Sequence, residues 1–355
     1  MPTLPLIADP ARYRACIQNL LTDGEVVRTY WLDLFVAHVE TLAKLPVNDQ
    51  CLRDSMAWSA FRDDYLAGLA DLRRTPDLRG RLTVLELTRY RDEKLHAHGF
   101  VDPFLDLKIR ENTLALRLLP TVLAALDAAP PDTLGDSLAR GLFAGNLFDM
   151  GSKAVVSEFE SGTFDFLTAR DRVRPRPWPV DDLDHWLLRL NSRQLRYRQC
   201  LFFVDNAGPD ILLGVIPFVR DLLFRETRVI LAANSAPALN DITAAELRPL
   251  LERVRTVDSR IDAALRDERL TVIESGCASP LIDLTELTHE CCDAAEACDL
   301  LILEGMGRAI ESNYDARFTR DTLKIALIKD RMVADILGVR LFDPIWRFEQ
   351  ADPRE

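Results

Sequence analysis

The sequence lacks the features that would place the protein in a membrane or outside the cell. No stretch approaches the roughly 18 apolar residues that a membrane-spanning helix needs. Residues 1–14 contain no continuous apolar segment of the kind found in secretory signals. The seven cysteines are odd in number, irregular in spacing and without a CxxC pair, so they favour reduced thiols over a disulfide framework or a zinc site. We therefore expect a cytoplasmic protein.

Positive charge is also scarce, because the formal net charge is −12. Proteins that bind nucleic acid or anionic membranes generally use an excess of Lys and Arg, so neither partner is expected. A few local cations and a bound metal can still make one cleft attractive to a small phosphorylated molecule. The oligomeric state does not follow from the sequence.

The chain is rich enough in apolar residues to build a sizeable core. It has 355 residues, of which 48% are hydrophobic and 28% charged, and its length suggests two domains. Apolar residues recur at three- and four-residue spacing before residue 144, as in residues 30–43 and 114–128, with Pro120 as a predicted kink or boundary. The proline-rich VRPRPWPV at residues 173–180 is typical of a linker. We predict a helical domain over residues 1–175 and a second domain over residues 176–355.

The second domain alternates short apolar runs with amphipathic segments. This pattern predicts right-handed strand–helix–strand crossovers and a parallel sheet with helices on both faces, an α/β fold. The predicted strands cover residues 200–204, 228–232, 270–273, 300–303 and 339–342. The predicted helices cover residues 210–224, 244–254, 259–266 and 322–337.

Polar residues, glycines and carboxylates follow each of the first four predicted strands. Asp205-Asn206 follow the first strand, a long polar loop ending at Asp241 follows the second, and Glu304 follows the fourth. Ligands of open α/β sheets bind beyond the carboxyl ends of the strands. Any one of these loops could be an ordinary turn, but together they predict a shared cleft. None of the five histidines falls in these loops.

Asp205 and Asn206 offer the hard oxygen ligands that Mg²⁺ or Mn²⁺ prefers. Asp241 is a candidate third ligand, although it also fits a helix N-cap shortly before Thr243. Such a metal would polarise a phosphoryl oxygen and activate an attacking water. Asp205 or Asp241 would accept the proton of that water. A direct attack by an Asp on phosphorus stays open.

A phosphate also needs hydrogen-bond donors and cations. Glycines let backbone N–H groups approach closely, a serine offers either a hydroxyl or a turn contact, and Arg and Lys supply charge. Two of the lysines lie five residues apart on a predicted helix, so at most one of them is expected in the cleft. The candidates are Gly208, Ser235, Gly305, Gly307, Arg308, Lys324 and Lys329.

The blocks around these residues resemble the damage-control phosphatase family, once called domain of unknown function 89. The resemblance rests first on residues 202–243, FFVDNAGPDILLGVIPFVRDLLFRETRVILAANSAPALNDIT, and on EGMGR at residues 304–308. EGMGR marks the subfamily that includes the phosphatase domain of pantothenate kinase 4 and free-standing plant relatives. TLKIALIKD, DPFLDLKIREN and AGNLFDMGSKAV also match, so the resemblance runs from about residue 102 to the C-terminus.

The resemblance implies an N-terminal helical domain and a Rossmann-like α/β/α domain with a mainly parallel sheet. It implies a divalent metal, Mg²⁺, Mn²⁺, Co²⁺ or Ni²⁺, held by Asp205, Asn206 and Asp241. It favours Lys324 over Lys329 as a phosphate ligand. The implied pocket lining comprises Asn146, Asp149, Glu304, Gly305, Met306, Gly307, Arg308 and Lys324.

The implied activity is hydrolysis of a small phosphomonoester, namely 4′-phosphopantetheine or its oxidised or damaged forms in the coenzyme A pathway. A sugar phosphate is the alternative substrate. Two alternative functions from other classes of protein remain. A methyltransferase is one, although the longer glycine fingerprint of a nucleotide-binding loop is absent after the first strand. A non-catalytic metabolite sensor is the other, because a fold does not fix a function.

Overall fold

Seven strands form one sheet, and six of them carry apolar runs long enough to be buried between helices. The computed structural model describes residues 1–48, 50–147, 166–192 and 196–351. The sheet order is β3-β9-β8-β7-β4-β5-β6, and every neighbouring pair is parallel except β8 and β9. The strands are β3 (Val180–Asp181), β4 (Gln199–Phe203), β5 (Arg228–Ala233), β6 (Leu270–Glu274), β7 (Leu300–Glu304), β8 (Asp321–Leu327) and β9 (Pro344–Glu349). The predicted mainly parallel α/β sheet is confirmed.

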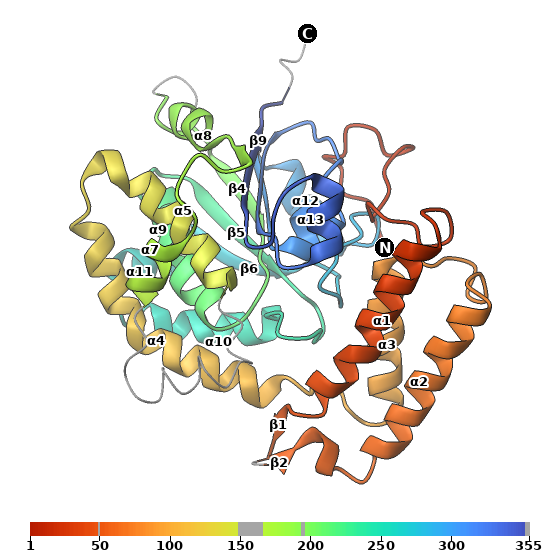
Figure 1. The fold of residues 1–355 in the computed structure, drawn as a ribbon. Coiled ribbons are helices and arrows are strands. Elements are labelled where there is room, and N and C mark those ends of the chain that lie inside the picture. The colour runs from red at the N-terminus through yellow and green to blue at the C-terminus, as the bar shows by residue number, and fades with distance from the viewer. Residues whose placement is uncertain (49, 148–165, 193–195, 352–355) are drawn as a thin grey trace.

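Helices cover both faces of this sheet (Figure 1). One face packs against α4 (Leu105–Asp127), α5 (Pro131–Leu147), α7 (Phe166–Arg172), α8 (Leu183–Leu190), η2 (Asp210–Val215), α9 (Ile216–Phe224), α10 (Ala244–Val254) and α11 (Ser259–Arg266). The other packs against α1 (Glu25–Leu42), α2 (Trp58–Arg74), α3 (Val84–Ala97), α12 (His289–Glu296), η3 (Met306–Glu311) and α13 (Arg331–Leu337). A short hairpin of β1 (Pro46–Val47) and β2 (Gln50–Cys51) and a turn, η1 (Leu52–Asp54), join α1 to α2.

The two-residue period of a strand divides β4 between the two cores. Phe202 belongs to one apolar cluster, while Leu201 and Phe203 belong to the other. Both clusters combine sheet residues with residues that precede position 175. The boundary between residues 175 and 176 stays a prediction. None of the described helices has the length and apolar character needed to cross a membrane.

The C-terminal part of the sheet differs from the sequence-based expectation. The helix predicted over residues 322–337 is wrong in its first half, because Asp321–Leu327 forms β8 and only Arg331–Leu337 is helical. Every residue of β8 is buried, and such a run cannot be told from a buried helix by periodicity. The strand predicted over residues 339–342 is also wrong, since β9 begins at Pro344. Pro120 neither ends nor interrupts α4, whose bounds extend well beyond it on both sides.

The chain order defines a switch point in the sheet. From β4 the chain proceeds through β5 and β6 in one direction, and β7 then returns to the other side of β4. The loops after β4 and β7 therefore diverge from neighbouring strands, which opens a crevice at their carboxyl ends. Asp205 and Glu304 stand at this position, one at the end of each strand.

Candidate functional site

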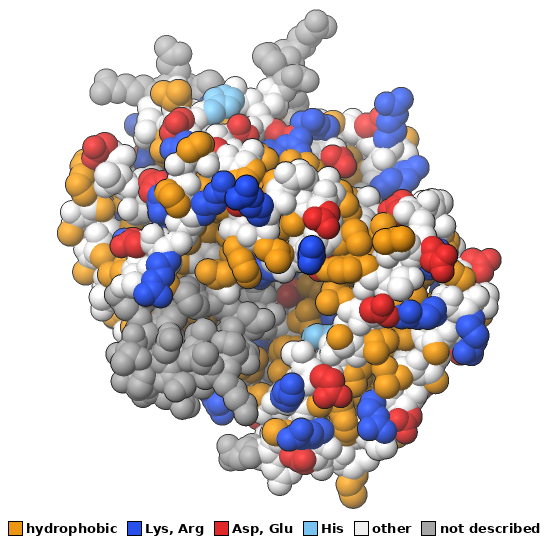
Figure 2. All heavy atoms as spheres, viewed as in Figure 1, with side chains coloured by type: hydrophobic (Ala, Val, Ile, Leu, Met, Phe, Trp, Pro, Cys, Tyr) orange, Lys and Arg blue, Asp and Glu red, His pale blue; other side chains and the backbone are white. Residues whose placement is uncertain are grey.

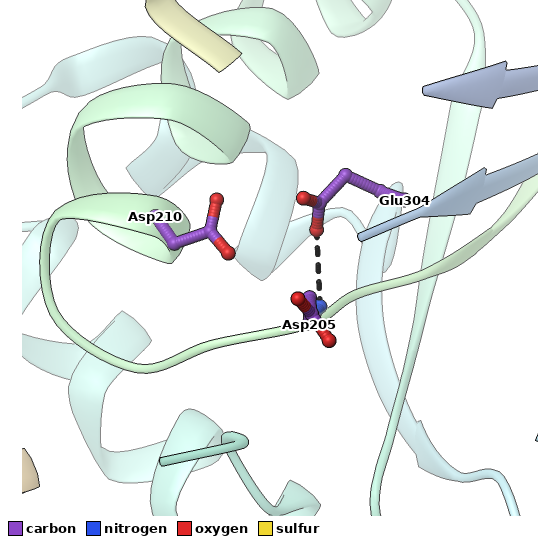
Figure 3. A group of neighbouring side chains, drawn as sticks. All are labelled: Asp205, Asp210 and Glu304. Atoms are coloured by element: carbon purple, nitrogen blue, oxygen red, sulfur yellow. Dashed lines mark hydrogen bonds between the residues drawn. The ribbon is translucent and has the colours of Figure 1, made fainter. Parts of the chain in front are cut away.

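Three buried carboxylates gather at the switch point. Asp205 follows β4, Asp210 begins η2 and Glu304 ends β7, and an oxygen from each lies within 4.8 Å of the others. Figure 3 shows the three side chains converging from these separate elements. The backbone N–H of Asp205 donates to Oε2 of Glu304 at 3.1 Å. The structure thus adds Asp210, which the sequence analysis missed because it lies inside a helix rather than in a loop.

Two amide side chains hold this acidic group together. Nδ2 of Asn146, at the end of α5, lies 3.2 Å from Asp205, 3.1 Å from Asp210 and 3.2 Å from Glu304. Nδ2 of Asn206 donates to Asp205 at 2.7 Å and to Asp210 at 2.9 Å. Oδ1 of Asn146 and Oδ1 of Asp210 are buried and have no hydrogen-bond partner among the residues that the structure describes. Buried acceptors without donors, set among carboxylates, suit a hard cation, so the site can bind a metal.

Asp241 reaches the same place from the loop after β5. Asn206 and Asp241 form an isolated antiparallel bridge, and the N–H of Ile242 donates to the carbonyl of Asp205 at 3.0 Å. Thr243, rather than Asp241, caps α10 by accepting from the N–H of Glu246. The alternative interpretation of Asp241 as the N-cap of that helix is therefore wrong.

Arg308 links the two aspartates that the sequence proposed as metal ligands. Its guanidinium pairs with Asp205 and, at 2.8 Å, with Asp241, and it donates to Oδ1 of Asn234 at 2.9 Å. All three members of the ion-pair group are less than a tenth exposed. The fork geometry of arginine lets one side chain contact two carboxylates, which compensates two buried negative charges.

Burial shifts the protonation of these acids. Desolvation, followed by the charge of Asp205, raises the pKa of Asp210 to about 6. Desolvation also raises the pKa of Asp241 to about 6, against the opposing effect of Arg308. The pKa of Glu304 lies well above its usual value because of burial and the nearby Asp210 and Asp205. Ionisation of all the clustered acids is therefore unfavourable unless a cation binds beside them.

Asp205 of the acidic group lines a cavity of about 420 Å³. Figure 2 shows this face hollowed between α1 and the body of the molecule. The carboxylate end of the cavity carries Asp205, Asn206 and Asp241, and Met306 and Gly307 add to the lining. The opposite wall is mostly apolar and comes from the N-terminal helices, with Trp31, Leu34, Phe35, Ala37 and Val84.

Charged and titratable groups on this wall were not found by the sequence analysis. Arg91 of α3 is buried, forms an ion pair with Asp92 and lines the cavity, as does His38 of α1. Burial, with Arg91 nearby, lowers the pKa of His38 to about 3, so this imidazole is neutral. No histidine lies in the predicted loops after the strands, but His38 reaches the cavity from α1. Helices distant in sequence gave no signal that their polar side chains would face the sheet edge.

Two other predicted phosphate ligands make different contacts. Nζ of Lys324 donates to the carbonyls of Tyr314 and Ala316 and pairs with Glu349, and Lys324 does not line the cavity. Lys329 does line it, and its Nζ donates to the carbonyl of Asn146 at 2.9 Å. Of these two lysines, Lys329 is thus the one at the cavity.

Oγ of Ser235 accepts from the N–H of Gly276 at 2.8 Å, a contact between the loops that follow β5 and β6 rather than within one turn. Gly305 and Gly208 have positive φ angles, and both approach acidic side chains closely. Asp149 lies outside the described residues. Of the predicted set, the structure thus brings Asp205, Asn206, Asp241, Asn146, Glu304, Gly305 and Arg308 together, with Met306 and Gly307 on the cavity wall.

The switch point of the α/β sheet thus gathers buried carboxylates beside a cavity, an arrangement that can bind a metal ion and a small ligand. The sequence model of the damage-control phosphatase ARMT1-like domain matches residues 32–345. The chain belongs to this family.

Named relatives cover nearly the whole chain. It is 36% identical over 398 residues to a 4′-phosphopantetheine phosphatase of Mus musculus, spanning 98% of this chain and 48% of the relative. It is 35% identical over 361 residues to a damage-control phosphatase of Arabidopsis thaliana, spanning 98% of this chain and 96% of the relative. A pantothenate kinase 2 of Arabidopsis thaliana matches at 35% identity over 98% of this chain and 42% of its own length. The chain thus spans less than half of the mouse relative and of the kinase.

A solved structure shows the same fold. The crystal structure of a DUF89 family protein from Pyrococcus horikoshii superimposes with a TM-score of 0.63 at 15% identity, covering 89% of this chain and 96% of that one. The expected combination of a helical N-terminal region and a mostly parallel sheet is confirmed.

Proposed function

We propose that this protein is a metal-dependent phosphatase that hydrolyses 4′-phosphopantetheine or its oxidised or damaged derivatives. The observation that carries the proposal is one cavity joining two chemically different ends. Buried carboxylates and amides lie at one end, and apolar side chains from α1 and α3 lie at the other. A phosphate ester with a long, weakly polar arm matches both ends. The names of the mouse and Arabidopsis phosphatases support the same activity.

Asp205, Asn206 and Asp241 would hold the cation, with Mg²⁺, Mn²⁺, Co²⁺ and Ni²⁺ as candidates. Asp210 and Glu304 add carboxylates beside Asp205, and all five residues offer the oxygen atoms that such ions prefer. The metal supplies Lewis acidity toward the phosphoryl group and an activated water. Because Arg308 already contacts Asp205 and Asp241, it is also placed to stay beside a phosphate bound there.

The other charged side chains of the cavity orient the substrate. Arg91 and Lys329 both line the cavity, and Lys329 also donates to the carbonyl of Asn146 beside the acidic group. Their positive charge attracts a phosphate dianion despite the net charge of the chain. Asp241 or Asp205 accepts the proton of the attacking water. The apolar wall excludes water from the arm of the substrate. We propose a cytoplasmic location, in keeping with seven cysteines that form no disulfide.

The test is phosphate release from 4′-phosphopantetheine and a panel of sugar phosphates, with each of the four metals, for the wild type and Asp205→Asn. We expect metal-dependent release from 4′-phosphopantetheine that falls by roughly 100-fold or more in the variant, because the variant loses a charged metal ligand. Faster release from a sugar phosphate would show that the preferred substrate is a sugar phosphate and would still support the phosphatase activity. If no ester is cleaved with any metal, the activity is refuted. Calorimetry with S-adenosylmethionine would then test the methyltransferase, and the absence of divalent metal binding would favour the sensor.

A further inference from the structure

One acidic side chain of the cavity has no role in the site described so far. Glu311 ends η3, lines the cavity near Gly307 and Met306, and is only 7% exposed. Its backbone carbonyl accepts from the N–H of Ile17 at 2.8 Å. In the part of the chain that the structure describes, its carboxyl group has neither a hydrogen bond nor an ion pair with another side chain. A buried polar group facing a cavity without a protein partner is suited to a ligand.

Glu311 lines the same cavity as Asp205 of the acidic end and Phe35 of the apolar wall, and it follows Gly307 of that lining in η3. Its carboxyl group is close enough to Asp205 and Asp330 for their charges to act on it. Oδ2 of Asp330 accepts from the hydroxyl of Tyr30 in α1 at 2.8 Å, so this second neighbour belongs to the side of the apolar wall. A phosphoester that fills the cavity has its phosphate at the acidic end and its arm along the wall. The bond that breaks would then lie between these two ends, inside the cavity that Glu311 also lines.

The same surroundings keep Glu311 protonated. Burial, followed by the charges of Asp330 and Asp205, raises its pKa to about 8 against the smaller opposing effect of Lys329. The other charged or titratable groups that line the cavity are Asp241, Arg91 and the neutral His38. Near pH 7 the side chain is therefore an acid with a proton to give, in contrast to a solvent-exposed glutamate.

We propose that Glu311 is a catalytic residue that protonates the leaving oxygen of the substrate. This role rests on the proposed phosphatase function. As water adds to phosphorus, the bond between phosphorus and the ester oxygen breaks and its electron pair stays on that oxygen. The Glu311 proton neutralises it, so the arm leaves as an alcohol. The proton that the attacking water loses to a nearby carboxylate is passed on to solvent, and Glu311 is reprotonated from solvent before the next turnover.

The test compares two leaving groups in Glu311→Gln. The alcohol of 4′-phosphopantetheine is a poor leaving group that needs a proton, whereas the nitrophenolate of p-nitrophenyl phosphate leaves without one. We expect kcat for 4′-phosphopantetheine to fall about 100-fold and kcat for p-nitrophenyl phosphate to change less than about threefold. The wild type should lose activity on the alkyl ester as the pH rises past about 8. The pH–rate profile of Glu311→Gln should not show this decrease. Glu311→Asp, which keeps the acid on a shorter side chain, should recover part of the loss.

Asp343→Asn is the matched control. Asp343 is also a buried carboxyl, but it pairs with Arg174 and does not line the cavity. Its substitution should leave the ratio of the two rates at the wild-type value. Metal affinity measured by calorimetry should be the same in Glu311→Gln and in the wild type. Equal losses on both esters, or no loss on the alkyl ester, would overturn the role of Glu311 alone. A wild type that cleaves neither ester would refute the phosphatase function itself.

Discussion

At the scale of single residues, Gly305 shows how closely the acidic site is packed. Its φ of +96° lies in the region that side chains rarely adopt, and a Cβ built there would overlap with the Asp205 carboxylate. The absence of a side chain at this position therefore lets the end of β7 approach Asp205, the proposed metal ligand. EGMGR thus contributes a close backbone approach as well as the carboxylate of Glu304 and the guanidinium of Arg308.

Gly305→Ala should lower kcat roughly 100-fold or more, since displacement of Asp205 by about 1 Å misaligns the reacting groups. Metal affinity, measured by calorimetry, should fall with it. Gly24→Ala is the control, because Gly24 has nearly the same φ, +99°, but nothing lies within 4 Å of an added Cβ. This control should cost about 1–2 kcal/mol of stability through backbone strain and keep the wild-type kcat. Wild-type metal affinity in Gly305→Ala would contradict the packing argument.

The residues that follow strands were predictable, and those placed by tertiary contacts were not. Asp205, Asn206, Asp241 and Glu304 were found because parallel strands end at a common edge. Asp210 was not found, because its position four residues into the next segment resembles an ordinary helix start. The metal ligands and the phosphate contacts stay predictions until a bound ion or substrate is observed.

At the scale of elements, β8 shows why a buried lysine was assigned to the wrong surroundings. Lys324 was expected on a helix, but it lies in a strand between β7 and β9 and is 0% exposed. Antiparallel pairing with β9 brings it to Glu349, 3.0 Å away, and burial lowers its pKa to about 8. Its charge therefore contributes to the pairing of two strands rather than to the cavity.

Lys324→Met should lower the free energy of unfolding by roughly 1–3 kcal/mol, because it removes one partner of a buried pair. The loss is limited because Arg317 and Arg347 also contact Glu349. Urea denaturation measures this change, and KM for the phosphoester should stay within about twofold of the wild type. A large rise in KM without loss of stability would restore the phosphate-binding role predicted from the sequence. Lys329→Met, in contrast, should raise KM.

At the scale of the whole molecule, the N-terminal helices complete a cavity that the sheet only begins. Residues of α1 and α3 belong to the same apolar cluster as Leu201 and Phe203 of β4, so packing on the sheet carries His38 and Arg91 to the site. This arrangement makes stability sensitive to acid. An unfolded chain protonates His38 near pH 6.5, whereas the folded chain does so only near pH 3.

Between pH 6.5 and pH 3, His38 therefore carries a proton in the unfolded chain but not in the folded one. The fold becomes less stable as the pH falls below about 6.5, because protons bind preferentially to the unfolded chain. Between pH 6.5 and 5 the expected contribution is about 2 kcal/mol. The free energy of unfolding of His38→Gln should therefore fall less with acid than that of the wild type over this window. His96→Gln is the control, because His96 lies outside the cavity. Parallel pH curves for His38→Gln and the wild type would show that His38 is not held neutral.

The sequence by itself determined the fold class and most of the acidic site, because both follow from local patterns. Alternating buried strands and helices force a parallel sheet, and the end of each strand marks where polar ligands meet. Only the tertiary structure decided that Arg308 bridges Asp205 and Asp241 and that Lys329 rather than Lys324 lines the cavity. It also decided that the Glu311 carboxyl group lines the cavity with no side-chain partner in the part of the chain that the structure describes. These relations join residues that are distant in sequence or that belong to elements whose type the sequence left ambiguous. No local pattern encodes which side chains packing will place together.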